Sequence, residues 1–84
     1  MDSIGGAVEF PMARKGIGFT VVVSGEAIEL AAGRPIALTD RASWVEEHMD
    51  LFTLTADRIR PLLTARGSRV FVESANVTAR GYAA

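Results

Sequence analysis

The amino-acid sequence predicts one small α+β domain, and three observations indicate this fold class. Apolar residues alternate with other residues between Ala7 and Val23 on both sides of a turn signal, which is typical of a β-hairpin. Between residues 43 and 66 they recur every three or four positions, as on a helix. Arg69–Glu73 alternates again and predicts a closing strand. An 84-residue chain has room for one core, so we expect a single domain over 1–84, ordered from about 6 to 78 and with flexible ends.

The hairpin prediction depends on a two-residue turn at Lys15-Gly16. With this turn, six apolar residues face one another in pairs on one side of the hairpin. The pairs are Met12 with Phe19, Phe10 with Val21, and Val8 with Val23. Pro11 falls on the other side and has no N–H to donate to a neighbouring strand. We therefore expect the first hairpin strand at the edge of the sheet.

The segment 24–33 predicts a short helix. Ser24 can cap its first amides, Gly33 can end it, and the Glu, Ala and Leu residues between them favour a helix. A second hairpin that turns at Ser24-Gly25 is the alternative, because the apolar residues around Glu29 also alternate with it.

A longer helical segment follows over residues 43–66. It can begin at Thr39-Asp40 or at Ser43, which would form a capping box with Glu46. Its core-facing stripe comprises Val45, Met49, Phe52, Ala56, Ile59 and Leu63. Pro61 and two threonines predict a kink, or a break into two helices, near 53–57. The expected fold is a small, mainly antiparallel sheet with helices packed on one face.

The composition is that of a globular protein, with 49% hydrophobic and 23% charged residues. The absence of cysteine excludes disulfides, thiolate metal sites and cysteine nucleophiles, and fits a reducing compartment. No apolar run approaches the length of a bilayer span, and Met1-Asp2-Ser3 does not resemble a secretory signal. We expect a cytoplasmic protein without membrane partners.

The charges divide unevenly along the chain. Residues 1–50 carry eight acids against four bases, for −4, and residues 51–84 carry two acids against five bases, for +3. A nucleic-acid contact could use four of these arginines, which are Arg58, Arg60, Arg66 and Arg69. Nucleic-acid modules are usually basic overall, and this chain has a net charge of −1. Charges that solvate two sides of a compact domain, or that pair two copies across an interface, are therefore the better interpretation.

No set of residues in the sequence converges on a catalytic or cofactor pattern. The single histidine, His48, stands beside Glu47 on a predicted helix, where a surface position explains it better than a metal ligand or general base. Ser24 lacks the preceding glycine of a nucleophile elbow and is better explained as a helix cap. We therefore expect a non-enzymatic domain without a cofactor, and keep a small enzyme using His48 as a remote alternative.

The second face of the predicted sheet carries a surplus of apolar residues. Pro11, Val22 and Phe71 would share this face with Thr20, Glu9 and Arg69. A short chain has few elements to cover it. A homodimer contact through this face or the edge strand would bury them, and an unidentified protein partner could do the same. The alternative is that a helix of the same chain covers this face.

The order of several short motifs resembles a known family. A strand Ala7–Pro11 leads to a turn at Gly16, then to Val23–Ala27, and Phe52 and Ile59 stand seven residues apart in the helical region. In this order the chain resembles short proteobacterial proteins that form a domain of unknown function. The resemblance extends over most of the chain and implies the fold described above, but no activity.

The motifs that carry this resemblance are packing and capping residues. Ala56 stands where the family is expected to have an arginine, and Ile28 where leucine is usual. No role of that arginine can therefore be transferred to this chain.

Overall fold

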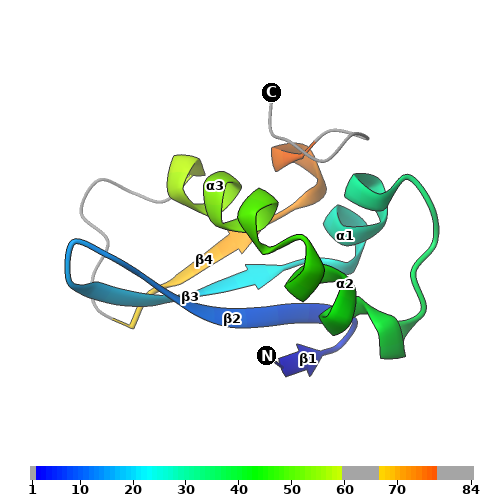
Figure 1. Ribbon diagram of the computed structural model, residues 1–84, viewed down its shortest axis with the longest axis horizontal. Helices are drawn as coiled ribbons and strands as arrows, with labels where there is room; N and C mark the ends of the chain where they lie inside the picture. Colours follow the sequence, from blue (N-terminus) through cyan, green and yellow to red (C-terminus); the bar gives the residue numbers. More distant parts are fainter. Residues whose placement is uncertain (1, 60–66, 78–84) are drawn as a thin grey trace.

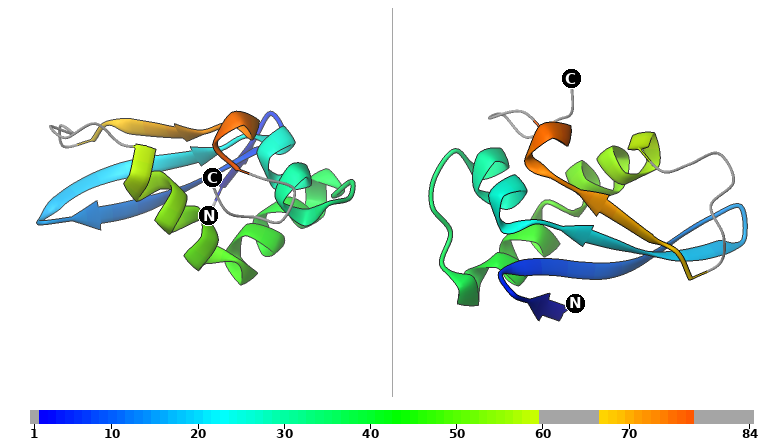
Figure 2. Two further views of the ribbon diagram at one scale, coloured as in Figure 1. Left: turned by 90° about the horizontal axis from the view of Figure 1, so that it is seen from above. Right: turned by 180° about the vertical axis from the view of Figure 1, so that it is seen from behind.

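The computed structural model describes residues 2–59 and 67–77, which form a four-stranded sheet with helices on one face (Figure 1). The strands are β1 (Asp2–Ile4), β2 (Ala7–Arg14), β3 (Ile17–Val23) and β4 (Arg69–Val72). The helices are α1 (Gly25–Ala32), α2 (Arg41–Glu47) and α3 (Met49–Ile59), with short 3-10 turns η1 (Leu38–Asp40) and η2 (Ser74–Asn76). The predicted α+β class is confirmed, and Figure 2 shows the helices on the same side of the sheet.

The strands lie in the order β1-β2-β3-β4. β1 pairs antiparallel with β2, and β2 pairs antiparallel with β3, whereas β4 runs parallel to β3. A parallel pair needs a long connection, and here all three helices lie between the two strands in the chain. The described sheet is therefore mainly antiparallel, as predicted, with one parallel pair at its edge.

The predicted hairpin is confirmed in its register. Met12 pairs with Phe19, and the other two apolar pairs follow as expected. Lys15 and Gly16 both have positive φ values, 52° and 78°, which is the backbone of a type I′ turn. That turn matches the natural twist of the strands and fixes which side chains face the helices.

The prediction that the first hairpin strand lies at the sheet edge is wrong for its first half. β1 pairs there, in residues for which the sequence predicted a flexible end, because Gly5 and Gly6 take positive φ values and fold the chain back. The ladder begins with Asp2 opposite Glu9. Pro11 lies two residues beyond this point, so its missing N–H removes no hydrogen bond with β1.

The helix alternative for residues 24–33 is confirmed. The Ser24 hydroxyl oxygen accepts a hydrogen bond from the Ala27 amide at 3.1 Å, which caps the start of α1. Gly33 ends the helix with φ 72°, and its amide donates to the carbonyls of Glu29 and Leu30.

The longer helical segment is broken, but not where the sequence predicted. α3 runs without interruption through 53–57, and the break falls at His48, whose φ and ψ of −118° and 33° are not helical. The Thr55 hydroxyl donates to the Leu51 carbonyl at 2.9 Å, so this threonine is satisfied within the helix. The His48 ring stacks on Trp44, with 3.9 Å between ring centroids, and this contact stabilises the turn.

The helical segment begins before Ser43, which was one of its two predicted starts. η1 leads directly into α2, which begins after Asp40 as the first alternative expects, although the Asp40 side chain makes no capping hydrogen bond. Ser43 lies inside α2 and its predicted capping box with Glu46 is absent. The segment beyond Ile59, with Pro61 and Leu63, lies outside the described residues.

The core fills the space between the sheet and the helices. Phe52 of α3 is fully buried at its centre, together with Ile28 of α1 and Val45 of α2. The sheet contributes Val8, Phe10, Phe19, Val21, Val23, Val70 and Val72. Because these strand residues alternate with residues of the opposite face, the core packing determines which side chains point away from the helices.

Candidate functional site

The candidate site is the face of the sheet that points away from the helices, here called the outer face. On β2, β3 and β4 its residues are Ala7, Glu9, Pro11, Ala13, Gly18, Thr20, Val22, Arg69 and Phe71, and the β1 ladder sets Asp2 opposite Glu9 and Ile4 opposite Ala7. None of the described helices packs on this face (Figure 2). Most of its residues are small or apolar, whereas a solvated sheet face usually alternates to polar residues.

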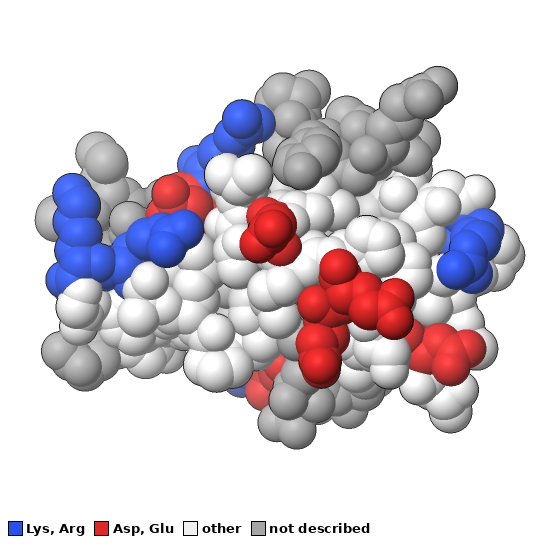
Figure 3. Space-filling model, in the orientation of Figure 1, with Lys and Arg blue, Asp and Glu red and all other residues white. Residues whose placement is uncertain are grey.

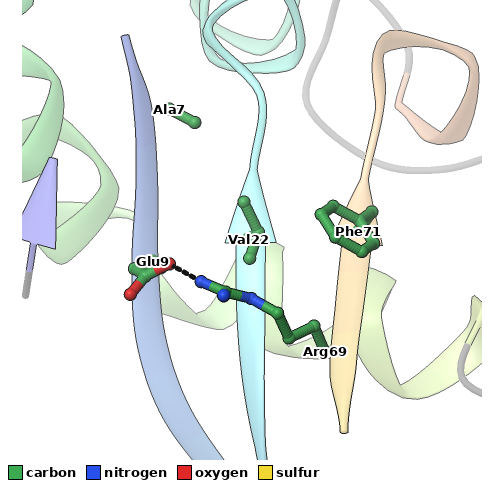
Figure 4. A pocket seen from close by; sticks show the side chains of 5 residues that line it. All are labelled: Ala7, Glu9, Val22, Arg69 and Phe71. Atoms are coloured by element: carbon green, nitrogen blue, oxygen red, sulfur yellow. Dashed lines mark hydrogen bonds and ion pairs between the residues drawn. The ribbon is translucent and has the colours of Figure 1, made fainter. Parts of the chain in front are cut away.

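Two charged residues of the outer face, Glu9 and Arg69, form an ion pair with each other. The Arg69 side chain extends from β4 across β3, and its Nη2 donates to Oε2 of Glu9 on β2 (Figure 4). The Glu9 side chain is 20% exposed and the Arg69 side chain 52%. On β2, β3 and β4 the outer face therefore carries one acid and one base, which pair with each other.

A hollow of about 280 Å³ lies beside this ion pair. Val22 forms its floor, Phe71 and Ala7 lie to its sides, and the Glu9–Arg69 pair borders it (Figure 4). The small side chain of Ala7 leaves this space open. Phe71 is 53% exposed, which makes it one of the most exposed large apolar side chains of the described chain.

The outer edge of β4 adjoins this hollow. The carbonyls of Ser68 and Val72 accept hydrogen bonds from the amides of Thr20 in β3 and of Ser24 just after it, at 2.8 and 3.0 Å. In a parallel ladder the intervening residues, Arg69 and Phe71, direct their backbone N–H and C=O groups away from that neighbour. No described strand pairs with this edge, which is only four residues long.

The structure brings together the three residues predicted for a contact face. Val22 and Phe71 are neighbours in the β3–β4 ladder, and Pro11 lies exposed on β2 on the same face. The alternative was that a helix of the same chain covers this face, and none of the described helices does so. The pairing of Glu9 with Arg69 was not predicted, because it depends on where β4 docks.

The four arginines predicted as a possible nucleic-acid surface are not brought together in the described part of the chain. Arg58 lies on α3, in the helical layer, whereas Arg69 lies on the outer face of the sheet. Arg60 and Arg66 fall outside the described residues. His48 is exposed, and its Nδ1 lies 2.8 Å from the Trp44 carbonyl oxygen.

Acidic side chains gather on the helical side of the molecule (Figure 3). Glu46 and Glu47 of α2 and Asp50 of α3 are all exposed there. Within residues 2–59 and 67–77, no three His, Cys, Asp or Glu side chains are grouped so that they could hold a metal ion. Negative charge near the start of α3 is favoured by the helix dipole, which accounts for Asp50.

Sequence reasoning also missed a structural role for Arg41. Its guanidinium donates to the carbonyls of Gly6 at 2.8 Å and Ile36 at 3.0 Å, and pairs with Glu29 at 3.3 Å. This side chain is only 15% exposed. It joins the β1–β2 turn to α1 and α2, and thereby supports the sheet end next to the outer face.

Comparison with known proteins found no matching family model, no matching curated protein and no matching solved structure. The resemblance to a family of short proteobacterial proteins therefore remains an expectation. Among the described helices, none has the length and apolar character needed to cross a membrane.

Proposed function

We propose that this protein is a non-enzymatic interaction domain that associates with a second copy of itself through the outer face. The observation that carries this proposal is a sheet face with exposed Phe71 and Pro11, half-buried Val22, and one acid and one base on β2, β3 and β4. Exposed apolar patches of this kind mark interaction surfaces in soluble proteins.

A second copy fits this face better than an unrelated partner because of its charges. In a two-fold symmetric contact, the same patch must be complementary to itself. The outer face carries both Glu9 and Arg69, so a rotated copy can set its acid against the base of the first. A patch with a single sign of charge would repel its own copy.

The substitution Val22→Glu tests this proposal, because Val22 forms the floor of the hollow and its side chain points away from the core. We expect size-exclusion chromatography with light scattering to give a dimer for the wild-type protein and a folded monomer for the variant. Circular dichroism and Trp44 fluorescence check that the variant is folded.

A matched control is Leu54→Glu, which adds the same charge to an apolar side chain that is 47% exposed on α3. This variant should remain a dimer. A wild-type monomer, or an unchanged mass for Val22→Glu, would overturn the proposal. Absorbance at two wavelengths across the peak detects bound nucleic acid, and a monomer that carries it would favour the arginine-based alternative instead.

A further inference from the structure

We infer that Glu9 and Arg69 determine how the two copies pair, by forming a closed ring of four alternating charges across the two-fold axis. In this ring each Arg69 contacts Glu9 of its own chain and Glu9 of the second copy. The inference rests on the proposed self-association and adds the residues that select the partner.

The chemistry of the two side chains permits this exchange. An arginine guanidinium has five N–H donors in a planar fork, and a carboxylate can accept about four hydrogen bonds. The contact within one chain uses Nη2 of Arg69 and Oε2 of Glu9. Since Arg69 is 52% exposed and lies across the sheet surface, its guanidinium is accessible to a second carboxylate.

The position of the pair also suits a two-fold axis. Arg69 reaches from the edge strand β4 over the middle of the sheet to β2, so the acid and base lie diagonally on the face (Figure 4). A two-fold axis that is parallel to the sheet face, lies above the midpoint of the pair and is perpendicular to the line joining the two charges places base over acid and acid over base. Phe71 and Val22 lie next to the pair, and their burial in the contact would exclude water and strengthen the charge interactions.

The Glu9–Arg69 pair could instead serve only to stabilise the monomer, but this is a weaker explanation for its presence on the outer face. Exposed ion pairs contribute little to folding, because water screens them and both side chains lose freedom. Within a contact between copies, the same charges reject wrong partners and wrong orientations, since like charges brought together are strongly unfavourable.

Charge reversal gives a sharp test. In Glu9→Arg both ring positions of each copy are basic, and in Arg69→Glu both are acidic, so each variant should repel its own copy. We expect each to weaken self-association by at least about 10-fold. A mixture of the two variants should form a heterodimer, because each basic position then meets an acidic one. Native mass spectrometry separates this heterodimer from either homodimer.

The double variant Glu9→Arg/Arg69→Glu is the matched control. It restores opposite charges within each chain and across the axis, so it should dimerise like the wild-type protein. If a reversed variant fails to fold, Glu9→Gln and Arg69→Gln remove one charge each without creating like-charge repulsion. Each should weaken the dimer and reduce its dependence on salt concentration.

The outcomes separate this inference from the proposed function. If Val22→Glu is monomeric but Glu9→Arg and Arg69→Glu form homodimers as tightly as the wild-type protein, the outer face is the contact and the charge ring is wrong. A mixture that fails to form heterodimers also refutes the ring. If the wild-type protein is a monomer, both the ring and the proposed function are wrong.

Discussion

Replacing Arg41 by alanine should strongly destabilise the fold. The Arg41 guanidinium donates to the carbonyls of Gly6 and Ile36, at 2.8 and 3.0 Å, and pairs with Glu29 at 3.3 Å. It therefore connects the β1–β2 turn with α1 and with the loop before η1. Alanine would leave these carbonyls without the charged donor and would open a gap between the elements.

The size of the effect follows from these contacts. A hydrogen bond to a charged group contributes about 1.5–3 kcal/mol, and we take the lower end because Arg41 is still 15% exposed. The contact with Glu29 adds no more than about 0.5 kcal/mol, since the Glu29 side chain is 36% exposed. The free energy of unfolding should fall by about 3 kcal/mol, out of the roughly 4–13 kcal/mol that a domain of this length has.

Urea unfolding followed by Trp44 fluorescence measures this change. Trp44 is the only tryptophan, and its ring makes an edge-to-face contact with the buried ring of Phe52. Its emission therefore reports on the packing of the helices. All variants must be compared at one protein concentration, because self-association adds to the apparent stability. Arg34→Ala removes an exposed arginine in the same region and should change the free energy of unfolding by less than about 0.5 kcal/mol.

A substitution at Gly25 gives a test that could refute this reasoning. A Cβ atom at Gly25 would lie 2.4 Å from an Arg41 guanidinium nitrogen, so Gly25→Ala should displace that side chain. The two substitutions should then be strongly non-additive, with Gly25→Ala less harmful when Arg41 is already alanine. Additive effects, or an Arg41→Ala loss below about 1 kcal/mol, would show that Arg41 does not join these elements.

Two further predictions concern local structure. Ser24→Ala should lower the free energy of unfolding by about 1 kcal/mol through loss of the α1 cap, whereas Ser24→Asp should retain most of it, as measured by urea unfolding. Lys15→Asn should raise the melting temperature by a few degrees, because asparagine tolerates the positive φ of 52° better than lysine, and a fall in calorimetry would contradict the turn assignment.

Local chemistry explains which elements the sequence predicted correctly. The hairpin needs only a turn with two positive φ values and apolar residues in phase on both strands, and all of these lie within 17 residues of the chain. The cap of α1 depends on Ser24 and an amide three residues later. Interactions over such short separations are visible in sequence spacing alone.

The features that the sequence missed depend on contacts between distant segments. Arg41 bonds to the Gly6 carbonyl 35 residues away, and nothing in its own neighbourhood indicates this. β1 has only three residues, although the Gly5-Gly6 pair before Ala7 was a turn signal that could have revealed it. The break at His48 has no such signal, because an aromatic residue four positions earlier also suits a continuous helix.

The residues of the candidate site were predictable from strand alternation, but the ion pair among them was not. The phase of the hairpin already places Pro11 and Val22 opposite the core, and alternation in β4 does the same for Phe71. The ion pair was not predictable, because Glu9 and Arg69 are separated by 60 residues and meet only when β4 docks parallel to β3.

The parallel docking of β4 also brings together charges from the acidic and the basic half of the sequence. The acidic first half contributes Glu9 and the basic second half contributes Arg69, and β4 brings these two charges together on one face. Arg14 and Asp57, again one from each half, form a second pair at 3.1 Å. A phosphate group would have to compete with Glu9 for Arg69, whereas a second copy of the chain would bring another carboxylate to the same guanidinium. The charge asymmetry is therefore better suited to self-association than to a nucleic-acid surface.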